Sequence, residues 1–236
     1  MLGSKIRRAL LAVVAFGGLL AVSGCATPEQ SMTAAKRSGL DSVQAALLVP
    51  QSGLEVSVRP IDGGQGGLLG VLIAAAIDVK REESARKAAA PILEAVRGFD
   101  FRAEMQRAID EESARQPRLP LRGGWQLETV DSPSHRRGVY DGSSASAVLF
   151  VQVDYRLESG VIHVDARAQL VPKAASLAAL RPAPKDDDPL AEGNAIYLKK
   201  FSFKRQAVTA DNAAAALAEG ARSVASQLIA DLGRDF

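Results

Sequence analysis

The sequence predicts an α+β fold, in which an antiparallel sheet of about five or six strands carries helices on one face, including a C-terminal helix. Two observations lead to this prediction. Apolar and polar residues alternate along Leu149–Leu157 and again along Ile162–Leu170, and the short segment Glu158–Gly160 suits a hairpin turn between them. After Asp211, which we expect to cap a helix, one apolar stripe recurs at helical spacing and would pack on the sheet: Leu217, Ala221, Val224, Leu228 and Leu232.

The first part of the domain is expected to combine a hairpin with a helix. Apolar runs at 43–49 and 54–58 flank Pro50-Gln51-Ser52-Gly53, which predicts two strands joined by a turn. A charged helical pattern follows. We expect Pro91 to kink or interrupt this helix and Gly98 to end it.

The middle of the chain is expected to pass from a second helix into strands. Asp100 can cap this helix, which ends before Pro117 and buries Met105, Ala108 and Ile109. Gly123-Gly124 is interpreted as a turn before a strand at 125–130, and residues 131–144 as a loop.

The remaining connection and strand complete the predicted sheet. Residues 172–194 contain four prolines, which predicts a long exposed connection. A strand is expected at 196–206, with Tyr197, Phe201 and Phe203 on one face.

The first 25 residues have the layout of a secretory signal peptide. Three basic residues precede the uncharged stretch 9–22, and the leader ends in Val22-Ser23-Gly24-Cys25. At this point the chain resembles the bacterial lipoproteins, whose lipobox is a branched apolar residue, two small residues and a cysteine. The resemblance implies diacylation of the Cys25 thiol, cleavage before Cys25 and acylation of the new amino terminus. An ordinary signal peptide is the alternative.

This resemblance implies a domain organisation and a location in the cell. Residues 1–24 would be the signal peptide, 25–42 the lipidated N-terminus and tether, and 43–236 a single periplasmic α+β domain; a short helix within 26–42 is the alternative to a tether. The acyl chains on Cys25 would hold the protein on a membrane. Because Ala26 rather than aspartate follows Cys25, we expect the periplasm-facing side of the outer membrane.

Composition argues against a nucleic-acid partner and against a disulfide. The leader holds three of the 29 basic residues, so the remaining chain has 26 basic residues against 27 acidic ones. This balance lacks the positive surface that nucleic-acid binding needs. Cys25 is the only cysteine, so the domain is expected to fold without a disulfide.

A glycine cluster precedes the most hydrophobic segment after the leader. The glycines between Asp62 and Gly67 do not match a Gly-x-Gly-x-x-Gly or P-loop spacing, so no nucleotide site is predicted. Leu68–Ile77 is too short to span a bilayer. A buried core helix is the leading interpretation, and a mobile apolar lip or insertion into lipid or into a groove on a partner protein is the alternative.

We predict no catalytic, metal or cofactor site. His135 and His163 lack a histidine partner at metal-ligand spacing, and the serines at 143, 144 and 146 lack a nucleophile-elbow motif. Asp186-Asp187-Asp188 lacks the spacing of a calcium loop. The basic pairs Arg136-Arg137 and Lys199-Lys200 could contact anionic headgroups, although ordinary surface charge also explains them.

The order of elements resembles, at fold level only, the periplasmic accessory lipoproteins, such as those of lipid-handling ABC transport systems and of curli secretion. We therefore expect a non-enzymatic accessory or scaffold lipoprotein that contacts an envelope protein complex through its sheet edge or through Leu68–Ile77. The alternative is a module that binds a small ligand or lipid in an apolar pocket between helix and sheet. A hydrolase using Ser143 and His135 is a weaker third hypothesis.

Overall fold

The fold is built on a mixed sheet. The computed structural model describes residues 29–58, 67–116, 120–181 and 187–235, with the backbone alone for 67–79 and 235. Its strands are β1 (Val43–Leu48), β2 (Glu55–Ser57), β3 (Leu121–Glu128), β4 (Ala147–Glu158), β5 (Val161–Pro172) and β6 (Tyr197–Arg205). They lie in the order β3-β1-β4-β5-β6, and β2 also pairs with β4. Helices and an open six-stranded sheet are thus observed, but the predicted antiparallel sheet is mixed, because β1 runs parallel to β3 and β4, and β2 runs parallel to β4.

The predicted hairpin over residues 43–58 is wrong. β1 and β2 do not pair with each other; both run parallel to β4, β1 beside Ala147–Gln152 and β2 beside Arg156–Glu158. The intervening segment therefore carries the chain onward along β4. The Gln51 side chain bridges the interruption, since its Nε2 donates to the Tyr155 carbonyl at 3.0 Å and its Oε1 accepts from the Tyr155 amide at 2.8 Å.

Two further corrections concern the segment from 121 to 144. Gly123 and Gly124, with φ of 76° and 72°, lie inside β3 and form a bulge. The bulge is seen in the pairing with β1, where Val43 to Ala45 is a step of two residues and their partners, Leu121 and Trp125, are four residues apart. The predicted loop over 131–144 is largely helix α5 (Pro133–Gly142). Ser132 caps this helix, its hydroxyl accepting from the His135 amide at 3.1 Å.

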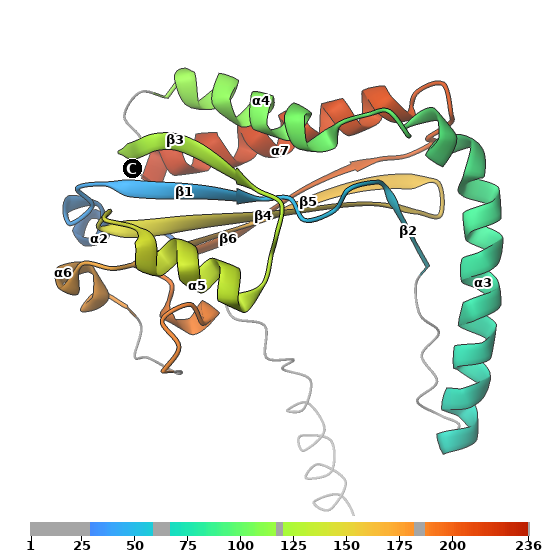
Figure 1. Cartoon of the computed structure of the whole chain (residues 1–236), viewed down its shortest axis with the longest axis horizontal. Helices are drawn as coiled ribbons and strands as arrows, with labels where there is room; N and C mark the ends of the chain where they lie inside the picture. The colour runs from blue at the N-terminus through green and yellow to red at the C-terminus, as the bar shows by residue number, and fades with distance from the viewer. Residues whose placement is uncertain (1–28, 59–66, 117–119, 182–186, 236) are drawn as a thin grey trace, which may run out of the picture.

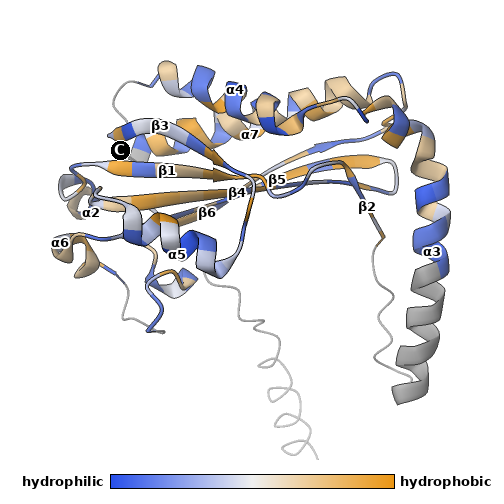
Figure 2. Ribbon diagram, in the orientation of Figure 1, coloured by the Kyte–Doolittle hydropathy of each residue, from blue (hydrophilic) through white to orange (hydrophobic). Residues whose placement is uncertain are grey.

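Helices cover both faces of the sheet, so the expectation of a single helical face is only partly met (Figure 1). Helices α4 (Phe101–Ala114) and α7 (Ala213–Asp235) cover one face and enclose the main core with it. On the other face, α5 and Leu190 pack on a smaller apolar cluster that consists of Ala46, Leu48, Val148, Phe150 and Val171. Figure 2 shows the hydrophobic residues concentrated along β1 and β4 between these layers.

Several predicted elements are confirmed. The β4–β5 hairpin turns at Ser159-Gly160, both at positive φ, as a two-residue turn requires. Asp100 caps α4, its Oδ1 accepting from the Ala103 amide at 3.0 Å. The predicted stripe of α7 is buried, although the residue just before the helix is Asn212 rather than Asp211. Gly220 brings α7 close to the sheet, since a Cβ there would lie 2.6 Å from Val164 Cγ2.

Helix α3 (Gly67–Ala95) stands beside the sheet and extends away from it (Figure 1). It continues through Pro91, so of the kink or interruption expected there the interruption does not occur. The prediction that Leu68–Ile77 is a buried core helix falls outside the described residues, since the structure describes only the backbone of this segment. In the described part of the chain, no helix is long and apolar enough to cross a membrane.

Two segments predicted to be irregular contain short elements. The N-terminal segment forms α2 (Ala34–Ser38), as the alternative of a short helix within 26–42 expected, and Gln30 pairs with Leu198 of β6. The connection after β5 contains α6 (Ala175–Ala178) and a 3₁₀ turn, η1 (Glu192–Asn194).

Candidate functional site

The lipidation candidate, Cys25, lies outside the described residues. The chain is first held by the sheet a few residues later. The Gln30 amide donates to the Leu198 carbonyl at 2.9 Å, and the Leu198 amide donates to the Gln30 carbonyl at 3.0 Å. Gln30 is therefore fixed against the start of the edge strand β6.

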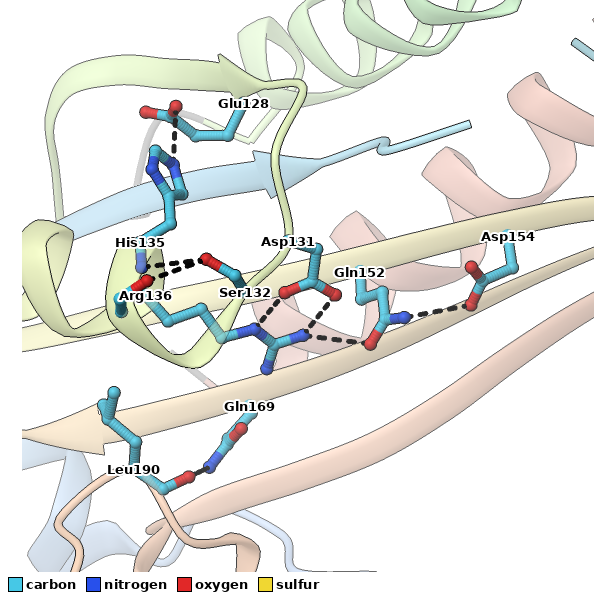
Figure 3. A network of polar contacts seen from close by, with 10 residues as sticks. Glu128, Asp131, Ser132, His135, Arg136, Gln152, Asp154, Gln169 and Leu190 are labelled. Carbon is cyan, nitrogen blue, oxygen red and sulfur yellow. Dashed lines mark hydrogen bonds and ion pairs between the residues drawn. The ribbon is translucent and has the colours of Figure 1, made fainter. Parts of the chain in front are cut away.

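A polar network joins α5 to the sheet beneath it (Figure 3). The Arg136 guanidinium donates to both carboxylate oxygens of Asp131, at 2.5 and 2.9 Å, and to Gln152 Oε1 at 3.0 Å. Gln152 in turn donates to Asp154 at 3.3 Å. The guanidinium also lies over the Phe150 ring, 5.9 Å from its centroid, a cation–π contact. The network thereby fixes the orientation of α5 on β4.

Burial raises the pKa of Asp154, and the nearby carboxylates of Asp131 and Asp165 add to the effect. Asp165 lies directly opposite Asp154 across the β4–β5 pair. Its charge is offset by Arg156, whose Nη1 lies 2.5 Å from Asp165 Oδ2. The polar face of the sheet is therefore charged and internally paired.

A groove runs between α5 and the segment from Asp188 to Glu192; we call it the α5 groove. One cavity of about 570 Å³ lies beside Arg136, Arg137 and Asp188, and a second of about 200 Å³ adjoins it over Gln152 and Gln169. The volume of the larger cavity is within the range of ligand sites, ~300–1,000 Å³.

The arginines of the α5 groove are already paired with acids. Arg136 pairs with Asp131, Arg137 with Asp188 at 2.6 Å, and Arg167 with Glu192. Among these three arginines, Arg167 has a buried Nε without a hydrogen-bond partner in the described structure. A phosphate would have to displace a carboxylate, so the groove suits a neutral polar ligand better than an anion.

The residues considered for nucleophilic catalysis serve the local structure. Ser143 Oγ accepts from the Ala145 amide at 3.2 Å, and Ser146 Oγ donates to the Ser42 carbonyl at 2.7 Å. His135 Nε2 lies 3.0 Å from Glu128 rather than beside a serine hydroxyl. These serines and His135 are therefore not brought together as a catalytic group.

His163 is buried in the polar face of the sheet, next to Arg156 on β4 and Lys204 on β6. Burial lowers its pKa, and the positive charge of Arg156 lowers it further. Its Nδ1 has no hydrogen-bond partner, which is consistent with a neutral ring. In the described residues no group of three or more His, Cys, Asp or Glu side chains is placed to hold a metal ion.

The run of aspartates considered for calcium is only partly described, because Asp186 lies outside the described residues. Asp188 pairs with Arg137 and accepts from the Leu190 amide at 3.0 Å. It thus helps to hold the segment that borders the α5 groove.

A buried carboxylate that the sequence analysis missed holds α7 on β6. Asp231 accepts from Tyr197 Oη at 2.8 Å, from Lys199 Nζ at 2.7 and 2.8 Å, and from Arg234 Nη2 at 2.8 Å. Burial alone would raise the pKa of Asp231, but the hydrogen bonds from Lys199 and Tyr197 outweigh it and the pKa is lowered. Lys199, considered as a headgroup contact, is engaged here instead.

An apolar pocket of about 340 Å³ lies where the end of α3 meets α4, α7 and β4. The Phe101 and Tyr155 rings, stacked 4.0 Å apart, form part of its wall. Arg97 also lines it and is largely exposed. Its apolar lining residues are Leu54, Leu93, Val96, Phe99 and Leu217.

Comparisons with known proteins find only distant structural likeness. No protein-family model and no curated protein matches the chain. The PelC dodecamer from Paraburkholderia phytofirmans is similar over 85% of this chain and 94% of that one, at 9% identity and a TM-score of 0.31. Protein XCC0632 from Xanthomonas campestris, of family DUF330, is similar over 87% of this chain and 86% of that one, at 11% identity and a TM-score of 0.32. At these scores the likeness establishes no shared function.

The polar network of α5 had a partial signal in the sequence. Ser132-Pro133 is a typical helix start, a cap followed by proline in the first turn. Gln152 and Asp154 alternate with apolar residues along β4, which marks them as facing away from the main core. That α5 folds over them depends on contacts between separate segments, which spacing does not reveal.

Proposed function

We propose that this chain is a lipid-anchored accessory or scaffold protein of the bacterial envelope, without catalytic activity, that faces the periplasm from the outer membrane. The observation that carries the proposal is the lipobox sequence Val22-Ser23-Gly24-Cys25 at the end of a basic and then apolar leader. The acyl chains on Cys25 would anchor the folded domain. Serine and histidine side chains that serve structural hydrogen bonds support a binding role rather than hydrolysis.

Two features could contact an envelope protein complex. Among the described residues no strand pairs with the outer side of β3. Leu127 near its end and Val130 just after it are 36% and 52% exposed. Helix α3 stands away from the sheet, and its described residues 80–84 are all exposed. Both features would be reachable by a second protein without unfolding the domain.

Metabolic labelling with a palmitate analogue tests the anchor. We expect the wild-type chain to be labelled and processed, and Cys25→Ala to remain an unlabelled precursor. A matched control, Cys25→Ala with Ser38→Cys, restores a thiol elsewhere and should stay unlabelled. Labelling of Cys25→Ala would overturn the proposal.

Photo-crosslinking in intact cells tests the contact surfaces. Photoreactive residues at Leu72 on α3 and at Gln126 on β3 should capture the same envelope protein in repeated experiments. The control position is Ser226, which is exposed on α7. Equal capture from all three positions, or none from Leu72 and Gln126, would contradict a scaffold role for these surfaces.

The apolar pocket supports a second candidate function, the binding of a single-chain lipid. An acyl chain would lie against Phe101 and Tyr155. An anionic headgroup near Arg97 would have to compete with Glu94, which pairs with this arginine. Native mass spectrometry of protein extracted from membranes should then show a bound lipid, lost in Leu54→Trp, which fills the pocket, and kept in the control Leu180→Trp, which alters an exposed site. Protein free of lipid in every preparation would exclude this candidate.

A further inference from the structure

The distance between the proposed anchor and the sheet is short. Five residue steps separate Cys25 from Gln30, which two backbone hydrogen bonds hold against Leu198. An extended chain of that length reaches about 17 Å. If Cys25 is acylated, the bilayer surface must therefore lie within that reach of the start of β6.

The strand at this position is basic. β6 carries Lys199, Lys200, Lys204 and Arg205 and no acidic residue. Lys199 pairs with Asp231, and Arg205 lies 3.4 Å from Glu219. Lys200 and Lys204 are exposed or nearly so, and in the described part of the chain no carboxylate lies within ion-pair distance of either.

The two lysines project from the same side of the edge. Phe201 packs in the main core on the α7 side, and alternate residues of a strand point to opposite faces. Lys200 and Lys204 therefore share the opposite face, beside Arg167 and His163 of β5. Arg167 and the largely neutral His163 carry no negative charge that could neutralise the lysines. Asp165, which lies between them opposite Ser202, is paired with Arg156.

We propose that the β6 edge is the membrane-facing surface of this protein, with Lys200 and Lys204 contacting the phosphates of an anionic lipid leaflet. The inference rests on the proposed acylation of Cys25, which holds the edge near the bilayer. A β6 edge held against the membrane would also set the orientation of the domain. β3 is the opposite edge of the sheet, four strand spacings or about 19 Å away, so it faces away from the lipid and remains open to a partner protein.

The test uses the chain from Cys25 onward, which contains every residue of the described fold. Cys25 is the only thiol, so it can be coupled to a maleimide lipid in vesicles of phosphatidylcholine alone or of phosphatidylcholine with phosphatidylglycerol. Lysine acylation followed by mass spectrometry then measures the exposure of each lysine. We expect Lys200 and Lys204 to react about fivefold more slowly on the anionic vesicles, while the exposed Lys80 on α3 does not change.

A second measurement uses Cys25→Ser protein without an anchor. Its partition onto the anionic vesicles should weaken about thirtyfold in Lys200→Gln/Lys204→Gln and should vanish at high salt. The control Lys80→Gln/Arg122→Gln removes the same charge from exposed sites on α3 and β3 and should bind like the parent.

The outcomes separate this inference from the proposed function. Equal reactivity of Lys200 and Lys204 on both vesicles, or equal weakening by the two double variants, would overturn the membrane-facing edge. If these lysines were shielded in cells but not on vesicles, the edge would bind a protein instead, and the lipid proposal would be wrong. Chemical coupling supplies the anchor, so the vesicle result is independent of whether cells acylate Cys25.

Discussion

Asp231→Asn probes the buried contact that holds α7 on the edge strand. The aspartate side chain is 8% exposed and its partner Lys199 is 17% exposed. The amide has the same shape but no charge, so the Lys199 ammonium loses the negative charge that Asp231 supplies. Removal of one partner from a buried ion pair costs ~3–5 kcal/mol. Because Lys199 keeps some contact with water, we expect the free energy of unfolding to fall by about 2–3 kcal/mol at pH 7.

The effect should depend on pH in a defined direction. The folded-state pKa of Asp231 is lowered, so its carboxylate contributes stability that is present above its unfolded pKa, about 3.9, and is lost as the pH falls through the folded value. The difference between wild type and Asp231→Asn should therefore be full near neutral pH and shrink below about pH 4.

Urea unfolding followed by the fluorescence of Trp125, the only tryptophan, measures this difference. Tyr197→Phe removes only one neutral donor and should cost about 1 kcal/mol, with the carboxylate still paired. Arg234→Gln changes a largely exposed side chain and should cost little. A loss in Asp231→Asn that stayed constant from pH 7 to pH 3, or that did not exceed the loss in Tyr197→Phe, would refute the reasoning.

Three further predictions concern α7, α5 and the polar face. Gly220→Ala should lower the free energy of unfolding by about 1 kcal/mol in urea titrations, because the clash with Val164 outweighs the better helix propensity; a stabilised variant would contradict this. Arg136→Met should release the contact with Asp131 and cost about 2 kcal/mol, seen as faster amide exchange in α5 but not in α7; unchanged α5 exchange would count against it. His163→Gln should flatten the stability profile below about pH 6.5, where the wild type loses stability because its lowered pKa favours the neutral ring; parallel profiles would show that His163 does not contribute.

The elements that local pattern specifies were predicted well. The β4–β5 hairpin follows from strict alternation on either side of a two-residue turn, and the cap of α4 follows from Asp100. The buried stripe of α7 follows from its helical period. Each of these signals is carried by residues close together in the chain, so no knowledge of distant contacts is needed.

The failed predictions share a different cause. Pro50–Gly53 resembles a turn, yet the chain continues along β4 because the Gln51 side chain replaces the missing backbone hydrogen bonds. Gly123-Gly124 has the composition of a turn as well, but its positive φ values serve a bulge within β3. In both places glycine permits several backbone conformations, and a distant strand selects one of them.

The sequence by itself predicts the lipobox at Cys25, and it determined the balance of charge, the absence of a second thiol and the presence of the main strands and helices. Only the tertiary structure decided that β1 lies parallel to β4, that α5 covers the second face, and that Gln30 is fixed beside Leu198 at the start of the edge strand β6. The physical reason is that periodicity and capping act over a few residues, whereas strand pairing and buried ion pairs depend on contacts between segments far apart in the chain.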